Sequence, residues 1–140
     1  YAVADPVRFA AVARDAGLDR FAWIAGLAEL AAPAYTAVGA RGFTSGLVNV
    51  APELSVRMAT ALREQDFPAA MEVWERVRAF EEMRTADGSR DNVSVVKEAM
   101  HQLGLCRADV RPPGARLDRA SRQRVAGCLA SWGLSGFGPE

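Results

Sequence analysis

The sequence predicts an α/β fold in its first third and helices alone in the remainder. An apolar run at residues 21–25 and a second short segment at residues 42–46 both indicate strands, and each is followed by a helical segment after only a few residues. This is the spacing of βα units in a parallel sheet. A pair of parallel strands has exposed edges and normally needs further strands beside it. The first third is therefore predicted to be a piece of a larger sheet.

The first helix and the first strand are bounded by clear signals. Asp5 followed by Pro6 predicts an N-cap and a first helical position, and Gly17 predicts the end of that helix. Residues 21–25 form a short run that is continuously apolar. Such a run predicts a strand that is buried on both faces.

The second helix is predicted over residues 28–38, with Pro33 in its first turns, where a missing N–H is tolerated. The second strand is predicted over residues 42–46, and its glycines predict a loop at its end. Together these segments give the order helix, strand, helix, strand.

Residues beyond 50 predict helices and loops only. One helix begins at Pro52, and Asp66 is predicted to cap the next. The apolar face of that second helix is predicted to consist of Phe67, Ala70, Met71, Trp74, Val77 and Phe80.

Two further helices are predicted, over residues 92–103 and 119–132. The first ends at Gly104, and the second is capped by Asp118 and ends at Gly133. Residues 85–91 and 106–117 are predicted to be loops.

Composition excludes several classes of protein. The 140 residues are half hydrophobic, and 17 basic residues balance 17 acidic ones. A neutral chain of this kind lacks the basic surface that nucleic acids and anionic membranes attract. Its apolar runs are far shorter than the roughly 20 residues of a membrane helix. Binding to nucleic acid or membrane is not expected.

The two cysteines, Cys106 and Cys128, have neither metal-ligand spacing nor the density of a secreted disulfide scaffold. The sequence also starts without the basic and apolar regions of a signal peptide. A cytoplasmic location is therefore expected.

Three stretches of the chain carry recognisable motifs. They are residues 39–53 (GARGFTSGLVNVAPE), residues 61–74, which begin with ALREQD, and residues 95–113, which contain VK, LGL and RPP. In this order they resemble the last barrel strand with the loop that follows it, the "ALREGD…A" pattern and the "VK…LGL…RPP" tail of the dihydrodipicolinate synthase and N-acetylneuraminate lyase family. The resemblance covers nearly the whole chain.

The resemblance implies the C-terminal part of a (β/α)8 TIM barrel. Residues 1–49 are then the last βα units of the barrel, and residues 50–140 are its eighth helix and a C-terminal helical region. The strand that carries the family's imine-forming lysine would lie immediately before Tyr1. Lys97, the only lysine of the chain, matches a helix position outside the family's active site.

The family acts on a 2-oxo acid such as pyruvate, through an imine with that lysine and without a metal or an organic cofactor. This chain is therefore expected to be inactive alone, with no catalytic residue of its own. It is expected to need the missing N-terminal barrel half and to share the family's tendency to form homo-oligomers. Whether the reaction is an aldol condensation, an aldol cleavage or a dehydration is left open.

Four residues match substrate-binding positions of the family. Gly26 matches a glycine whose carbonyl faces the keto acid, and Thr44 and Ser45 match positions that line the imine pocket. Glu29 matches a glutamate that contacts sugar hydroxyls in the neuraminate-lyase branch. Ala28 replaces the neighbouring acid of that branch, which argues against sialic acid as the substrate.

Structural interpretations of the same residues remain open. Gly26 is also compatible with a strand-to-helix turn that requires unusual backbone angles, and Thr44 and Ser45 with capping of a strand end. Glu81 and Glu82 are predicted to face water at a helix end, and His101 to have a structural role.

The rival hypothesis for the whole chain belongs to another class of function. In it, the apolar faces of residues 50–132 form a stand-alone helical interaction domain without catalytic activity.

Overall fold

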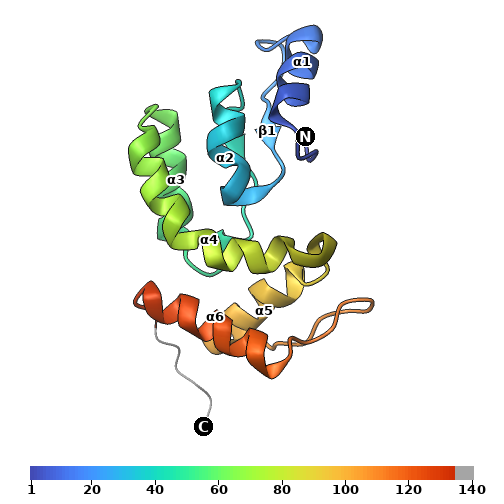
Figure 1. Ribbon diagram of the computed structural model, residues 1–140, viewed down its shortest axis with the longest axis vertical. Coiled ribbons are helices and arrows are strands. Elements are labelled where there is room, and N and C mark those ends of the chain that lie inside the picture. Colours follow the sequence, from blue (N-terminus) through green and yellow to red (C-terminus); the bar gives the residue numbers. More distant parts are fainter. Residues whose placement is uncertain (135–140) are drawn as a thin grey trace. The chain divides into compact units, whose positions relative to one another are not determined.

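The computed structural model describes residues 1–134 and divides the chain into two compact units, Tyr1–Glu75 and Arg76–Glu140 (Figure 1). The first unit contains α1 (Pro6–Ala16), β1 (Ile24–Ala25), α2 (Ala28–Ala37), β2 (Gly42–Phe43), a 3-10 turn η1 (Leu47–Asn49) and α3 (Pro52–Arg63). Helix α4 (Phe67–Ser89) contributes to both units, and α5 (Asn92–Gln102) and α6 (Arg119–Ser131) belong to the second. The predicted order of elements is confirmed. The division at residues 49 and 50 into barrel and helical region stays a prediction.

The two strands pair in parallel, with Ile24 opposite Gly42 and Ala25 opposite Phe43. Tyr1 lies along the other edge of β1. Its amino group donates to the Ile24 carbonyl at 3.0 Å, and the Gly26 N–H donates to the Tyr1 carbonyl at 2.7 Å. This alternation is the hydrogen-bond pattern of a parallel ladder. Tyr1 therefore occupies the position of a residue in a third parallel strand.

The described residues cover only one face of this sheet. Ala25 is fully buried against α1 and α2, whereas Ile24 is 39% exposed. Successive side chains of a strand point to opposite faces of the sheet. The face of Ala25 is therefore covered by the helices, whereas the face of Ile24 is open. The expectation of a strand buried on both faces was wrong. The strand is also shorter than expected, since Phe21 lies outside it and is exposed.

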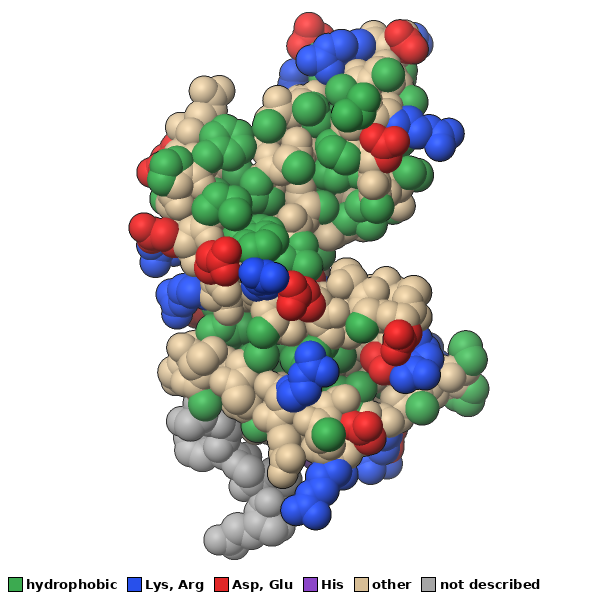
Figure 2. Space-filling view, viewed as in Figure 1, with side chains coloured by type: hydrophobic (Ala, Val, Ile, Leu, Met, Phe, Trp, Pro, Cys, Tyr) green, Lys and Arg blue, Asp and Glu red, His purple; other side chains and the backbone are tan. Residues whose placement is uncertain are grey.

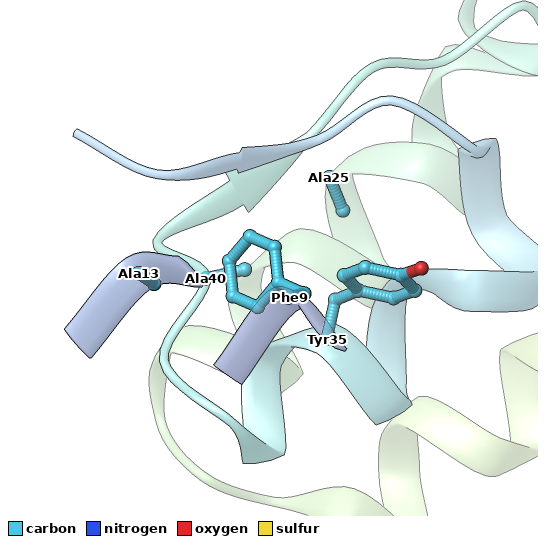
Figure 3. Packing of buried hydrophobic residues seen from close by; sticks show 5 residues of the cluster. All are labelled: Phe9, Ala13, Ala25, Tyr35 and Ala40. Carbon is cyan, nitrogen blue, oxygen red and sulfur yellow. The ribbon is translucent and has the colours of Figure 1, made fainter. Parts of the chain in front are cut away.

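An aromatic cluster fills the helix-covered side of the sheet (Figure 3). The Phe9 ring meets the rings of Tyr35 and Trp23 edge to face, with centroids 5.2 and 5.7 Å apart. The Tyr35 hydroxyl donates to the Val3 carbonyl and accepts from the Asp5 N–H. Tyr35 therefore joins α2 to the segment that leads into α1.

Helix ends follow the predicted caps. The side chains of three aspartates accept backbone N–H groups three residues ahead, in the pairs Asp5 with Arg8, Asp66 with Ala69 and Asp118 with Ser121. The glycines expected at helix C-termini, Gly17, Gly104 and Gly133, all have positive φ angles. Within residues 1–134, no helix combines the length and the apolar character needed to cross a membrane.

Helix α4 buries a different set of residues from the one that the sequence predicts. Met71 is 39% exposed, and Val73 is fully buried instead. Val73 follows Ala70 by three residues and precedes Val77 by four, so these three share one side of the helix. The backbone leaves the helical conformation at Ala86, in accord with a predicted loop from residue 85.

Glu81 does not face water, contrary to expectation. Its side chain is buried and pairs with Arg84 at 2.5 Å, while the Arg84 guanidinium also donates to the Asn92 side-chain carbonyl at 3.0 and 2.9 Å. A buried charge is tolerated only when it is paired. These residues link α4 to the start of α5. In the same unit, the Trp132 ring packs edge to face on Phe80 and donates its N–H to the Arg76 carbonyl at 2.9 Å.

The Asp118 cap makes the stability of the second unit depend on pH. The Ser121 backbone N–H bonded to Asp118 holds the pKa of this carboxyl below its ordinary value. Its stabilising contribution is therefore complete above the ordinary pKa of about 3.9. It is lost as pH falls through the lowered pKa of the folded state. Asp118→Asn keeps an N-cap acceptor that does not titrate in this range.

We expect the free energy of unfolding of the native chain, measured in urea, to fall relative to that of the Asp118→Asn variant as the solution is acidified. Other carboxyl groups titrate in both proteins, so the difference between the two curves isolates Asp118. Parallel curves from neutral pH to pH values below about 3 would contradict this assignment.

Candidate functional site

The site is built at the carboxyl ends of the two strands. Gly26 directly follows β1, and Thr44 and Ser45 directly follow β2. Glu29 lies in the first turn of α2. In parallel α/β folds this edge of the sheet carries ligand-binding groups. The structure therefore brings all four predicted residues to one end of the sheet.

Glu29 is the centre of a buried hydrogen-bond network. Its side chain is fully buried, and its Oε1 accepts from the hydroxyls of Ser45 and Ser55, the latter at 2.6 Å. The two hydroxyl oxygens lie 3.1 Å apart. Each hydroxyl has a single proton, so this short separation follows from both protons converging on one acceptor. Glu29 thereby joins α2, the end of β2 and α3.

Ser45 has a fixed orientation as a result. While its hydroxyl donates to Glu29, the same oxygen accepts from the Val48 N–H at 2.9 Å, which anchors the start of η1. Both the donor and an acceptor position of Ser45 are therefore occupied.

The second oxygen of Glu29 has no partner among residues 1–134. Oε2 is buried and accepts no hydrogen bond. Leaving a buried polar atom unsatisfied costs about 1–3 kcal/mol. Such groups are rare in folded proteins and call for an explanation. Oε2 is thus an acceptor available to a donor from outside the described part of the chain.

The side chains of Thr44 and Ser45 point to opposite faces of the sheet. Ser45 points toward α2 and α3, where it meets Glu29, whereas the Thr44 side chain is exposed. The Thr44 N–H donates to the Ala25 carbonyl at 2.9 Å, so it continues the ladder beyond β2. By the alternation of side chains, Thr44 shares the uncovered face of the sheet with Ile24.

Gly26 is explained by a close approach rather than by unusual backbone angles. It is not among the residues with positive φ. A Cβ atom at this position would lie 3.0 Å from the Ala2 Cβ and 3.1 Å from the Tyr1 carbonyl oxygen. A side chain at residue 26 would therefore press on the segment that pairs with β1.

The unusual backbone of this turn is at Ala28 instead. Its φ is 59°, a left-handed conformation that costs an L-residue about 1–2 kcal/mol. Strained residues of this kind cluster at functional sites. The sequence predicts unusual backbone angles at Gly26, because glycine adopts them easily. An alanine such as Ala28 gives no sign in the sequence that its backbone is strained.

Ser55 was also missed from the sequence. One signal was present, because Ser55 is a polar residue on the buried side of α3, next to Leu54 and one turn from Met58. A buried hydroxyl requires a partner. Only the fold reveals that this partner is Glu29.

Two other chemically interesting residues, His101 and Lys97, belong to the second unit. The His101 Nδ1 lies 3.1 Å from the Cys106 carbonyl oxygen, which fits a structural role. Lys97 is on α5 in the second unit, whereas both strand ends belong to the first. Within residues 1–134, no group of histidine, cysteine and acidic side chains could hold a metal ion.

Comparison with known proteins decides the family. Residues 5–131 match the model of the dihydrodipicolinate synthetase family. The chain belongs to this family. It is similar to the 4-hydroxy-tetrahydrodipicolinate synthase of Thermomicrobium roseum, with 34% identity over 81% of this chain and 36% of that protein. The corresponding enzyme of Parvibaculum lavamentivorans is 32% identical over 71% of the chain and 33% of that protein. The chain thus spans about a third of the length of these curated relatives.

Solved structures of the family confirm the fold. The dihydrodipicolinate synthase of Bacillus clausii superposes with a TM-score of 0.90 and 41% identity, over 96% of this chain and 46% of that one. The synthase from Oceanobacillus iheyensis gives 0.89 and 39%, over 96% and 45%. The predicted fold, the C-terminal part of a (β/α)8 barrel, is correct. The match also favours the barrel hypothesis over a stand-alone helical domain.

The Glu29 network can be tested by stability. We expect Ser55→Ala to lower the free energy of unfolding by about 1–3 kcal/mol, because a buried carboxyl oxygen loses a donor. Ser131→Ala, on the exposed end of α6, is the matched control and should change stability by less than about 0.5 kcal/mol. Urea unfolding of both variants measures the difference. Equal effects would show that Ser55 contributes no more than a surface serine.

The backbone at Ala28 gives a second test. Ala28→Gly should raise the free energy of unfolding by up to about 1 kcal/mol, because glycine adopts positive φ without a steric cost. Ala34→Gly, at an exposed position of the same helix, should lower it by about 1 kcal/mol. Thermal or urea unfolding distinguishes the two. A loss of stability in both variants would place Ala28 among ordinary helical residues.

Proposed function

We propose that this chain is the C-terminal portion of a Schiff-base lyase or synthase that acts on pyruvate or another 2-oxo acid, and that it is inactive alone. Family membership and the partial coverage of its relatives support this proposal. The chemistry begins when a lysine amine attacks the keto carbonyl and water leaves. The protonated imine then accepts the electron pair of the bond that breaks.

The observation that carries the proposal is the pairing of Tyr1 with β1. The Tyr1 ring packs on Phe9, on the helix-covered side of the sheet. A residue directly before Tyr1 would therefore point to the opposite face. That is the uncovered face to which Ile24 and Thr44 also point. A lysine at this position would share this face of the sheet with Thr44.

Each predicted residue receives a role in this proposal. Thr44 offers a hydroxyl to the keto acid from the uncovered face, and the backbone carbonyl of Gly26 borders the same edge. Ser45 holds the loop after β2 through Val48, and Glu29 fixes Ser45. Oε2 of Glu29 remains as an acceptor for a substrate hydroxyl or for a donor from the rest of the barrel.

The proposal includes the setting of the enzyme. The catalytic lysine comes from the N-terminal barrel half, not from Lys97, and the chemistry needs no metal or organic cofactor. We further propose that the whole protein is a cytoplasmic homo-oligomer, as the resemblance implies.

Trapping of the imine tests the reaction. The complete protein that contains residues 1–140 is incubated with pyruvate and borohydride, and the modified peptide is identified by mass spectrometry. We expect the adduct on a lysine directly before Tyr1. The isolated chain should give none, and Lys97→Arg in the complete protein should leave the adduct unchanged. An adduct on Lys97 would falsify the assignment of the lysine, and a complete protein without any adduct would contradict the proposed chemistry.

A further inference from the structure

The register of the sheet extends to Tyr1. This residue donates to the Ile24 carbonyl and accepts from the Gly26 N–H. In a parallel ladder, a residue with these two bonds is paired with the residue between its partners, which is Ala25. Ala25 is in turn paired with Phe43. All three paired side chains belong to the helix-covered face, so their neighbours along each strand point to the uncovered face.

Two rows of residues on the uncovered face follow from this register. The lower row consists of Ile24, Gly42 and the position directly before Tyr1. The upper row, which is nearer the carboxyl edge, consists of Ala2, Gly26 and Thr44. A Cβ atom at Gly26 would lie 3.0 Å from the Ala2 Cβ, which agrees with a place for both residues on the same face.

Ile24 is the one large side chain that the described residues contribute to these rows. Figure 2 shows that hydrophobic side chains lie on the surface of the first unit, and Ile24 is 39% exposed. A Cβ atom at Gly42 would lie 3.4 Å from the Ile24 Cδ1. Ile24 therefore extends over Gly42 and gives the lower row an apolar surface.

The upper row leaves room for a long side chain. Gly26 has no side chain, and that of Ala2 is a single methyl group. Side chains of a strand lean along the strand direction. A long side chain from the position before Tyr1 can therefore extend past Ala2 and Gly26 to the carboxyl edge, where we place the keto acid. Lysine suits this path, because an apolar stem carries its amine.

We propose that Ile24 is a positioning residue for the imine-forming lysine: it packs against the apolar stem of a lysine directly before Tyr1 and keeps the amine in apolar surroundings. Neighbouring strands are about 4.7–4.9 Å apart, so the two paired side chains lie side by side. The inference rests on the location of the lysine within the proposed function, but not on its reaction with pyruvate.

This contact has a chemical consequence. Apolar surroundings disfavour the charged form of a lysine and so lower its pKa. The neutral amine is the form that attacks a keto carbonyl. The described residues of the two rows carry no charge; they are Ala2, Ile24, Gly26, Gly42 and Thr44. On the side of these residues, the amine is therefore tuned by exclusion of water and not by a neighbouring charge.

Two substitutions of similar shape test the inference. Ile24→Val keeps a branched apolar side chain, whereas Ile24→Thr has a hydroxyl group in place of one methyl group. In the complete protein that contains residues 1–140, the lysine before Tyr1 is labelled with fluorodinitrobenzene over a range of pH, and the labelled peptide is quantified by mass spectrometry. We expect the native midpoint to lie below the ordinary lysine pKa of about 10.4. Ile24→Thr should raise it by about half a pH unit or more relative to Ile24→Val.

Val12→Thr is the matched control. Val12 is also a branched apolar residue of the first unit and is 38% exposed, but it lies on α1, outside both rows. This substitution should leave the midpoint of labelling unchanged. Thermal unfolding of each variant establishes that the substitutions leave the protein folded.

Several outcomes overturn the inference. Equal midpoints for Ile24→Val and Ile24→Thr do so, and so does a shift in Val12→Thr as large as that in Ile24→Thr. A residue other than lysine before Tyr1 overturns it together with the proposed function. The expected shift in a protein that forms no pyruvate adduct contradicts the proposed chemistry alone and supports the role of Ile24.

Discussion

The arrangement of the first unit depends on one buried carboxyl group that accepts hydrogen bonds from two hydroxyl groups. Glu29 bonds Ser45 and Ser55, which lie 16 and 26 residues further along the chain. These contacts bring the start of one helix, the end of a strand and the buried side of a second helix to a single point. A fully buried acceptor cannot exchange these donors for water, so the arrangement of the three elements is fixed together. The loop that follows β2 is held in place by the hydrogen bond from the Val48 N–H to the Ser45 hydroxyl.

The two faces of the sheet have different surroundings. On the side of the helices, Phe9 and Tyr35 fill the space beneath β1. On the other side, Ile24 and Thr44 remain uncovered by described residues. Packing therefore belongs to one face and, in our proposal, chemistry to the other. This is the separation that a (β/α)8 barrel imposes on its strands.

Local signals in the sequence were sufficient for the helices. Caps such as Asp118 and terminators such as Gly17 act through backbone groups only a few residues away, so they can be interpreted without the fold. The burial of the strands was harder to predict, because the exposure of a residue such as Ile24 depends on which other elements cover it. Glu81 was misjudged for a related reason, since its burial requires Arg84 and Asn92 as partners.

The four site residues were predicted from the resemblance to the family. Their geometry could not be predicted from the sequence. No periodicity links Glu29 to Ser55, and no residue type reveals that Ala28 rather than Gly26 has the left-handed backbone. Both features arise from a tight connection between strand and helix, whose shape is decided by the packing around it.

Helix α4 has a consequence for any attempt to produce the two units separately. The boundary between them falls between Glu75 and Arg76, inside this helix. Val73 and Val77 are both fully buried and lie four residues apart, yet the boundary assigns them to different units. An expression boundary placed there would sever a continuous helix and leave an apolar stripe in water on each product. Soluble halves would have to carry the helix intact, with overlapping rather than abutting ends.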